Sequence, residues 1–286
     1  MSVRARILGF VCIAALLPAG ARAEGIDTEH LFAFMIGSDV GNVGEKEFQS
    51  QATARFSKAA GNYRAMAQEF ELEFVPVRNV RIEVGSTFAS HDIAGVPGFA
   101  DRFQFGFQGI LLDLRYRFLD RETGPFGLIL AAETHADRLD ETTAAPVRKY
   151  GTEVTLAVDR ELIPDVSVAA VNLIYQPEWT RFSGAGQTER EATIGAAMAV
   201  MAQIRPGFFL GGEARYLRKY DGIGLDDFEG HALFIGPTVF VKLSDRSRLT
   251  ANWSFQAWGR PAGSTAALDL LNFERHQARL VLGVNF

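Results

Sequence analysis

Apolar and polar residues alternate with a period of two through most of the chain from residue 47 onward. In the stretch 69–74, for example, three glutamates alternate with Phe70, Leu72 and Phe74. Successive side chains of a β-strand point to opposite faces, so this alternation predicts strands that are apolar on one face and polar on the other. Twelve segments follow the rule, and the sequence therefore predicts an all-β fold.

The spacers between these segments alternate in length. Short spacers rich in turn residues occupy 76–79, 162–165, 205–207 and 244–247. Longer spacers rich in Gly, Asp, Ala and Pro occupy 91–102, 139–146, 220–230 and 260–271. Bacterial outer-membrane barrels have short turns at one end, longer loops at the other, and an even number of strands. We therefore predict a transmembrane antiparallel up-and-down β-barrel of about twelve strands over residues 47–286.

One segment changes phase along its length. Its phenylalanines at positions 103, 105 and 107 share a parity that belongs to Asp113 and Arg115 further along the same segment. A β-bulge, in which one strand carries an extra residue, resets the two faces. We expect such a bulge near Gln108 and Gly109.

A soluble β-sandwich or lipocalin alternates in the same way but turns its apolar faces inward. The predicted strands are longer than the roughly 5–6 residues of a sandwich strand and suit a tilted membrane crossing of about 9–11 residues. The chain also ends in an alternating strand closed by Phe286, which resembles the assembly signal of Gram-negative outer-membrane barrels. These features favour a membrane barrel, with outer-membrane lipid, lipopolysaccharide and the barrel-assembly machinery as its partners.

Residues 1–23 predict a cleaved secretory signal peptide. Arg4 and Arg6 precede a short apolar run, and Ala21-Arg22-Ala23 forms a small-residue cleavage site. An N-terminal anchor is the alternative, but the run is shorter than the roughly 20 residues of a spanning helix. The single cysteine lies within this run, so the exported chain has no thiol for a disulfide, a metal site or catalysis. We expect residues 24–46 to form a periplasmic leader, a plug in the lumen or an extra strand.

Three segments carry a resemblance to a known family, namely 114–123, 211–217 and 272–278. With them, the chain from about residue 30 resembles a proteobacterial outer-membrane family loosely grouped with meta-pathway phenol-degradation barrels. The resemblance implies an outer-membrane location and a barrel fold. The link of that family to the uptake of aromatic compounds is associative, and the resemblance assigns no functional residues.

The sequence contains no catalytic motif of an outer-membrane hydrolase. None of the five histidines is followed two residues later by serine, and no G-x-S-x-G, H-E-x-x-H or glycine-rich nucleotide loop is present. Glu133, His135 and Asp137 share one strand face and have the residue types of a general base or a metal site, but we interpret them as part of a lattice of lumen charges. The formal net charge of −5 argues against nucleic-acid binding. We expect no enzyme activity, no cofactor and no metal.

Charged residues on the polar faces define the candidate pore lining: Glu69, Glu71, Glu73, Arg81, Glu83, Asp113, Arg115, Arg117, Glu133, His135, Glu153, Glu213, Arg215, Arg275 and Arg279. Acidic and basic strips on opposite walls would orient polar solutes in a pore, whereas charges that pair would close the interior. Twelve strands enclose a lumen between those of eight-stranded barrels and sixteen-stranded porins. We predict a channel for small solutes, with small organic or aromatic compounds as candidates. The alternatives are a closed structural barrel and a lipid-modifying outer-membrane hydrolase.

Overall fold

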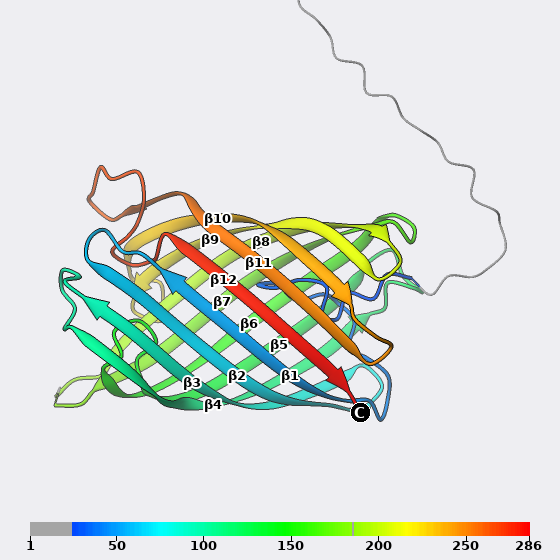
Figure 1. Ribbon diagram of the computed structural model, residues 1–286, viewed down its shortest axis with the longest axis horizontal. Coiled ribbons are helices and arrows are strands. Elements are labelled where there is room, and N and C mark those ends of the chain that lie inside the picture. The colour runs from blue at the N-terminus through cyan, green and yellow to red at the C-terminus, as the bar shows by residue number, and fades with distance from the viewer. Residues whose placement is uncertain (1–24, 185) are drawn as a thin grey trace, which may run out of the picture.

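The computed structural model describes residues 25–184 and 186–286. Twelve antiparallel strands form a closed barrel, in which each strand pairs with its sequence neighbours and β1 pairs with β12 (Figure 1). The predicted fold class is thereby confirmed. The strands are β1 (Lys46–Phe56), β2 (Asn62–Val77), β3 (Val80–Ala94), β4 (Arg102–Leu119), β5 (Gly127–Leu139), β6 (Pro146–Ile163), β7 (Ser167–Phe182), β8 (Glu189–Arg205), β9 (Phe208–Asp221), β10 (Asp227–Lys242), β11 (Ser247–Pro261) and β12 (His276–Asn285).

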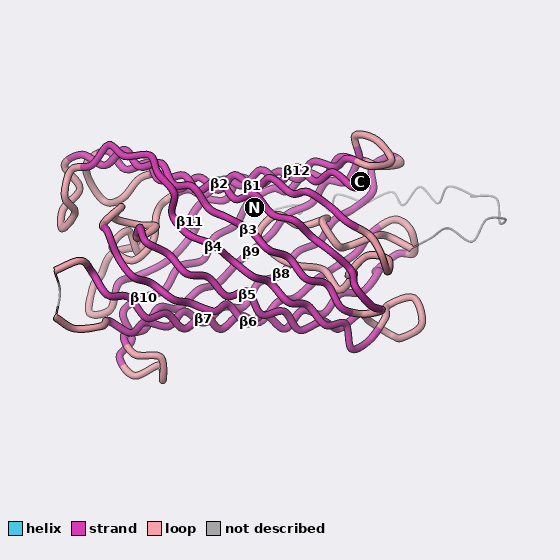
Figure 2. Tube along the Cα trace, turned by 90° about the horizontal axis from the view of Figure 1, so that it is seen from below, coloured by secondary structure: helices cyan, strands magenta, loops and turns pink. Residues whose placement is uncertain are grey.

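The two ends of the barrel differ in their connections. We call the end at which β1 begins and Phe286 lies the proximal end, and the opposite end the distal end (Figure 2). Three of the short proximal turns contain Asn79, Asp165 and Gly207 at φ angles of 68°, 58° and 73°. Asn, Asp and Gly adopt this left-handed conformation more readily than other residues, which explains their presence at these turns. The longest connection, 262–275, joins β11 to β12 at the distal end.

Strand β4 contains the predicted bulge. Thr87 pairs with Gly109, whereas the next residue, Phe88, pairs with Phe107, so that Gln108 is an extra residue in the ladder. Apolar side chains on both sides of the bulge then face outward. The expected bulge near Gln108 is therefore confirmed.

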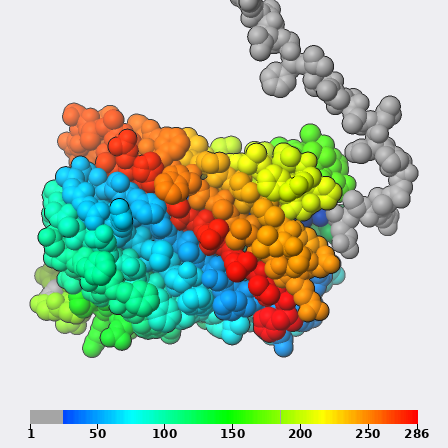
Figure 3. All heavy atoms as spheres, viewed as in Figure 1, coloured from blue at the N-terminus to red at the C-terminus, as the bar shows by residue number. Residues whose placement is uncertain are grey.

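Burial in this barrel is inverted relative to a soluble protein. Outward strand positions are exposed and apolar, as at Leu72 and Leu173, whereas inward positions include the buried charged residues Glu73, Arg81 and Glu213. An apolar outer belt over polar interior positions is the pattern of a barrel that faces lipid. Figure 3 shows the strands of this wall as diagonal bands that lie side by side. No helix among the described residues is long and apolar enough to cross a membrane.

Residues 25–45, here called the inner segment, lie inside the barrel as irregular chain (dark blue in Figure 1). Leu31 and Met35 pack against Val168, Met201 and Phe209, which face inward from β7, β8 and β9. Val40 of the same segment packs against Ile129 and Ala157, so the inner segment contacts apolar positions on two parts of the lumen wall. The predicted signal peptide lies outside the described residues and stays a prediction.

Candidate functional site

The structure separates the candidate pore-lining residues into two levels of the lumen. A cavity in the distal half is lined by Glu69, Glu133, His135, Glu153, Arg215 and Arg279. Buried on the proximal side of this cavity are Glu71, Glu73, Arg81, Glu83, Asp113, Arg115 and Glu213. The candidate pore-lining residues therefore span two regions, and the cavity lies in the distal one.

Two arginines of the candidate set lie apart from these levels. Arg117 is at the proximal rim, 3.5 Å from Asp39 and 3.2 Å from Asp120. Arg275 has the parity of an inward residue, but β12 begins only at His276, and Arg275 is exposed on the loop that precedes the strand. Arg275 is not among the residues that line the distal cavity, and a pore-lining role for it stays a prediction.

Ion pairs centred on Arg81 fill part of the proximal level. This fully buried side chain contacts Glu83 on its own strand. It also reaches Glu29 of the inner segment at 2.8 Å and Glu73 of β2 at 3.3 Å. Arg81 therefore links the inner segment to the barrel wall.

Further pairs extend this network around the lumen. Arg115 lies 2.6 Å from Asp113 and 3.2 Å from Glu83. Glu47 on β1 pairs with Arg248 on β11. Buried charges are tolerated where they are paired and hydrogen-bonded. At the proximal level the arginines thus pair with buried carboxylates of neighbouring strands and of the inner segment.

Asp159 on β6 anchors the inner segment near the proximal end. Its carboxylate accepts hydrogen bonds of 2.7 Å from the hydroxyl of Thr28, the backbone N–H of Ser38 and the hydroxyl of Ser38. Arg121, in the turn between β4 and β5, donates to the same carboxylate at 2.9 Å and to Asp39 at 2.7 Å. Thr28 and Ser38, ten residues apart in the inner segment, therefore both hydrogen-bond to the buried carboxylate of Asp159.

The inner segment reaches the middle of the lumen at Phe34. The backbone N–H groups of Ala33 and Phe34 donate to Glu213 at 2.8 and 2.9 Å. Asn172 accepts a hydrogen bond from the N–H of Ile36 and donates one to its carbonyl, at 2.8 and 2.9 Å. The backbone of residues 33–36 thus bonds to side chains of the barrel wall, Glu213 and Asn172, and does not pair with a strand.

Phe34 forms the floor of the distal cavity. Its ring lies between two guanidinium groups, with the Cζ of Arg215 3.8 Å and that of Arg279 4.4 Å from the ring centre. A guanidinium over an aromatic face is attracted by the ring quadrupole. The two arginines therefore hold this ring across the lumen.

The distal cavity has a volume of about 470 Å³, within the range of small-molecule sites. Ten Asp and Glu side chains line it, against five from Lys and Arg. Such an excess of one sign raises the local concentration of counter-charged solutes and repels solutes of the same charge. The cavity therefore favours cations and neutral molecules over anions.

The charges of the cavity are also sorted in space. In the strand register Glu133 lies between Asp113 on β4 and Glu153 on β6, which makes a row of carboxylates across three strands. Arg215 and Arg279 project from β9 and β12, on the other side of the closed strand order. Lys149 on β6 and Glu191 on β8 also line the cavity, so the two signs of charge are only partly separated, and the strips expected from the sequence stay a prediction.

Contacts between loops shape the mouth of the cavity. Lys58 donates hydrogen bonds to the carbonyls of Phe273 and Leu271, at 2.9 and 3.3 Å, and so joins the β1–β2 loop to the β11–β12 loop. Burial lowers the pKa of this amine. Nearby, Arg55 lies 3.0 Å from Glu141 and lowers the pKa of that loop carboxyl to about 2, so Glu141 stays ionised.

His135 lies on the cavity wall among carboxylates. Its Nδ1 is 2.8 Å from Asp137, and its Nε2 is 3.6 Å from Glu178, which in turn pairs with Lys149 at 2.7 Å. A catalytic triad needs a hydroxyl or thiol within hydrogen-bond reach of the histidine. Within the described residues no such group bonds to His135, so its geometry is that of a charge lattice.

Sequence analysis missed the residues that fix the inner segment. Asp159 and Arg121 are not among the candidate residues predicted from the sequence, and Phe34 lies in the segment 24–46, for which three assignments are open. The available signal was the apolar run from Leu31 to Ile36, which is uncharged and lies outside the alternating region. Only the three-dimensional contacts show what this run packs against.

The sequence model of DUF6662, a family of unknown function, matches residues 24–286. The chain belongs to this family. No curated protein matches the sequence of this DUF6662 member. The narrower meta-pathway grouping stays a prediction.

Solved structures share the fold of this DUF6662 barrel. It is similar to the COG4313 outer membrane channel from Pseudomonas putida F1, with a TM-score of 0.59 and 12% identity over 87% of this chain and 98% of that one. It is also similar to the NanC porin, with a TM-score of 0.49 and 11% identity over 84% of this chain and 100% of that one. The TM-score of 0.59 shows that the COG4313 channel shares the barrel fold, and an identity of 12% leaves the solute of this chain open.

Proposed function

We propose that this protein is an outer-membrane channel through which small solutes pass passively, with the inner segment as its plug. The observation that carries the proposal is the floor of the distal cavity. That floor is Phe34, a residue of a non-strand segment, and not a continuation of the barrel wall. A lumen closed by a separately held segment can open without disrupting the sheet.

The contacts of the inner segment support a plug that moves. Hydrogen bonds and ion pairs from Glu213, Asn172, Asp159 and Arg81 hold it, and β1 continues the chain only from Lys46. A population in which these side-chain bonds are broken leaves all twelve strand pairings intact. In the outer membrane, the proximal end with its short turns faces the periplasm and the distal cavity faces the exterior.

The lining of the cavity supports a class of solute. The carboxylate excess disfavours anions, and the volume admits small organic molecules. We infer that neutral and positively charged small organic solutes pass in preference to anions. The protein acts without catalysis, lipid and lipopolysaccharide cover its apolar belt, and the exposed Phe286 is available to the barrel-assembly machinery.

Permeation into liposomes tests this function. The mature protein (residues 24–286) and a form lacking residues 25–45 are reconstituted, and swelling is followed in small neutral sugars. Heat-modifiable gel mobility establishes that both forms are folded. We expect faster swelling for the shortened form. Equal impermeability of both folded forms would contradict the channel.

A closed structural barrel is the second candidate. It is favoured by the proximal level, where Arg81, Arg115 and Arg248 each pair with buried carboxylates and leave the lumen filled. Such a barrel stabilises the membrane or presents its loops and passes no solute. The liposome experiment separates the two functions. A barrel whose wall side chains fill the lumen stays impermeable after the inner segment is removed, whereas a plugged channel becomes permeable.

A further inference from the structure

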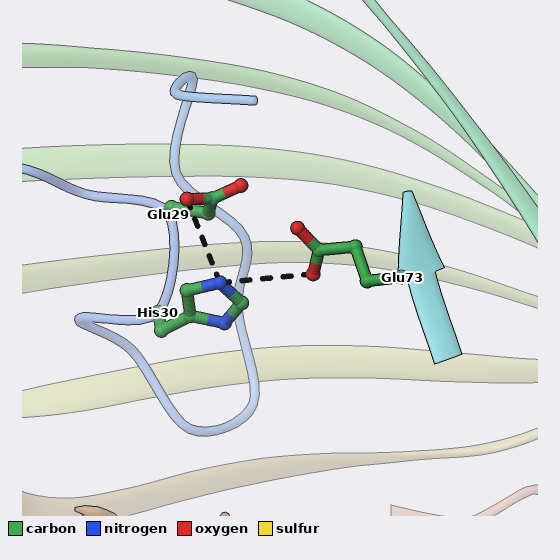
Figure 4. A group of neighbouring side chains, drawn as sticks. All are labelled: Glu29, His30 and Glu73. Atoms are coloured by element: carbon green, nitrogen blue, oxygen red, sulfur yellow. Dashed lines mark ion pairs between the residues drawn. The ribbon is translucent and has the colours of Figure 1, made fainter. Parts of the chain in front are cut away.

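Three ligand-type side chains converge where the inner segment meets β2. Glu29 and His30 of the inner segment face Glu73 of β2, as Figure 4 shows. His30 Nε2 lies 3.7 Å from Glu29 Oε2 and 3.8 Å from Glu73 Oε2, and the three atoms lie within 4.8 Å of one another. Glu47 of β1 approaches the same nitrogen at 3.8 Å.

Polar atoms at this point are buried without hydrogen bonds. His30 is 7% and Glu73 is 4% exposed, yet neither His30 Nε2 nor Glu73 Oε2 has a hydrogen-bond partner among the described residues. A buried polar group without a partner costs free energy comparable to a lost hydrogen bond. The two atoms face one another, and Glu73 Oε2 is also 3.3 Å from Arg81 Nε in an ion pair, so a cation bound between them would give His30 Nε2 the partner that it lacks.

The charges around this point do not balance. The connected ion pairs contain five carboxylates, from Glu29, Glu47, Glu73, Glu83 and Asp113. Only three guanidiniums face them, from Arg81, Arg115 and Arg248. By formal count the carboxylates exceed the guanidiniums by two, which is the charge of one divalent cation.

We propose that Glu29, His30 and Glu73 form a binding site for one divalent transition-metal ion, with Zn²⁺ as the best match. Imidazole and carboxylate ligands together suit zinc, which they bind at about 2.0–2.2 Å. Ligands at that distance in a tetrahedron lie roughly 3.4 Å apart. The spacings of 3.7 and 3.8 Å from His30 need shifts of only a few tenths of an ångström, and the two carboxylates, which lie within 4.8 Å of each other, would move together by up to about 1.4 Å on binding. Glu47 or a water takes the fourth position.

The remaining oxygen of Glu29 supports this assignment. Its Oε1 accepts the 2.8 Å hydrogen bond from Arg81, which leaves Oε2 directed at His30. Metal ligands are commonly oriented by such outer hydrogen bonds. The ion would join two residues of the inner segment to one of the wall and fasten the segment inside the barrel. Metal binding does not require the barrel to conduct, whereas an effect of the metal on opening rests on the proposed function.

Metal binding is tested on the mature protein refolded in detergent with ZnCl₂ and then dialysed against metal-free buffer. The expected result is one zinc per chain by elemental analysis. His30→Ala and Glu73→Gln are expected to weaken zinc affinity at least about tenfold, in the range seen for lost ligands and their supports. His276→Ala is the matched control, because it removes a histidine outside the cluster and is expected to bind zinc as the unchanged protein does.

A second measurement separates a specific site from loose binding. Co²⁺ in place of Zn²⁺ is expected to give visible absorption from a low-symmetry nitrogen and oxygen site, and His30→Ala is expected to abolish it. Heat-modifiable gel mobility shows that each variant is folded. Substoichiometric zinc in the folded protein, or zinc binding that survives His30→Ala unchanged, would overturn the proposal.

Discussion

The ring of Phe34 lies 3.8 Å from the guanidinium carbon of Arg215, in the middle of the barrel. One partner belongs to the inner segment and the other to β9, so this contact crosses the boundary between plug and wall. Arg279 packs against the same ring at 4.4 Å. The contact also ends the open part of the lumen, and its removal is the most local way to test whether the inner segment closes the barrel.

Phe34→Ala is expected to open the channel more often without unfolding the barrel. The substitution removes the floor of the distal cavity and two cation–π contacts, each worth about 0.5–2 kcal/mol. Open probability in planar bilayers measures the effect. Val43→Ala is the control, since Val43 belongs to the same segment but is 62% exposed. Equal open probability for both variants would show that Phe34 is not the barrier.

Asp159→Ala is expected to release the inner segment from the lumen. The substitution removes three hydrogen bonds from Thr28 and Ser38 and leaves Arg121 without one of its carboxylates, a loss of roughly 3–5 kcal/mol for a buried pair. Cleavage after Glu29 by a glutamate-specific protease reports the release. Asp165→Asn, in an exposed turn, is the control. Equal rates of cleavage after Glu29 in Asp159→Ala and in the control would show that Asp159 does not hold the inner segment in the lumen.

Gly127→Ala is expected to weaken the seating of the inner segment through a steric clash. A Cβ at this position would lie 1.8 Å from the hydroxyl of Ser38 and 2.7 Å from Asp159. Gly106→Ala is a matched control, because its Cβ would meet only a leucine methyl at 3.7 Å. Ser38→Gly should partly rescue Gly127→Ala in the protease experiment, and a lack of any rescue would place the clash elsewhere.

Glu133→Gln combined with Glu153→Gln is expected to reduce the preference for cations. These carboxylates form part of the acidic row, so their neutralisation lowers the negative potential of the lumen. Arg215→Gln is expected to act in the opposite direction. Reversal potentials under a salt gradient measure both effects. Shifts of the same sign in the two variants would contradict the charge assignment.

Lys58 is expected to give the barrel a stability that rises at alkaline pH. Burial lowers its pKa in the folded state, so between that value and the unfolded value of about 10.4 the unfolded chain binds more protons. Stability therefore increases as pH rises through this window and levels off above it. The urea midpoint of the protein minus that of Lys58→Met should grow from pH 8 to pH 10.5. A constant or falling difference would contradict a depressed pKa.

Much of the fold follows from the sequence because strand faces depend on local parity. The alternation of Phe70 and Leu72 with Glu71 and Glu73 predicts a strand whose polar face points inward, and the phase change in β4 predicts the bulge at Gln108. Both features need only the period-two geometry of a strand. A soluble sandwich alternates in the same way, and the length of the predicted strands is what favours a polar lumen with lipid outside.

The site depends on contacts that no local pattern encodes. Glu73 looks like any other lumen carboxylate, and only the fold brings it to His30 and Glu29, which lay in a segment with three possible assignments. Likewise, the parity of Arg275 is inward, but the strand that would carry it starts one residue later. Pairing across the lumen depends on where distant strands meet, which the sequence of one strand does not show.

Single-channel conductance, with and without the inner segment, tests most directly whether a plugged channel is present. The mature protein and the form lacking residues 25–45 are inserted into the same planar bilayer after their folding is established by gel mobility. We predict rare, brief openings for the mature protein and larger, sustained, salt-dependent steps for the shortened one. A folded shortened barrel that stays silent would contradict the channel and leave a closed structural barrel.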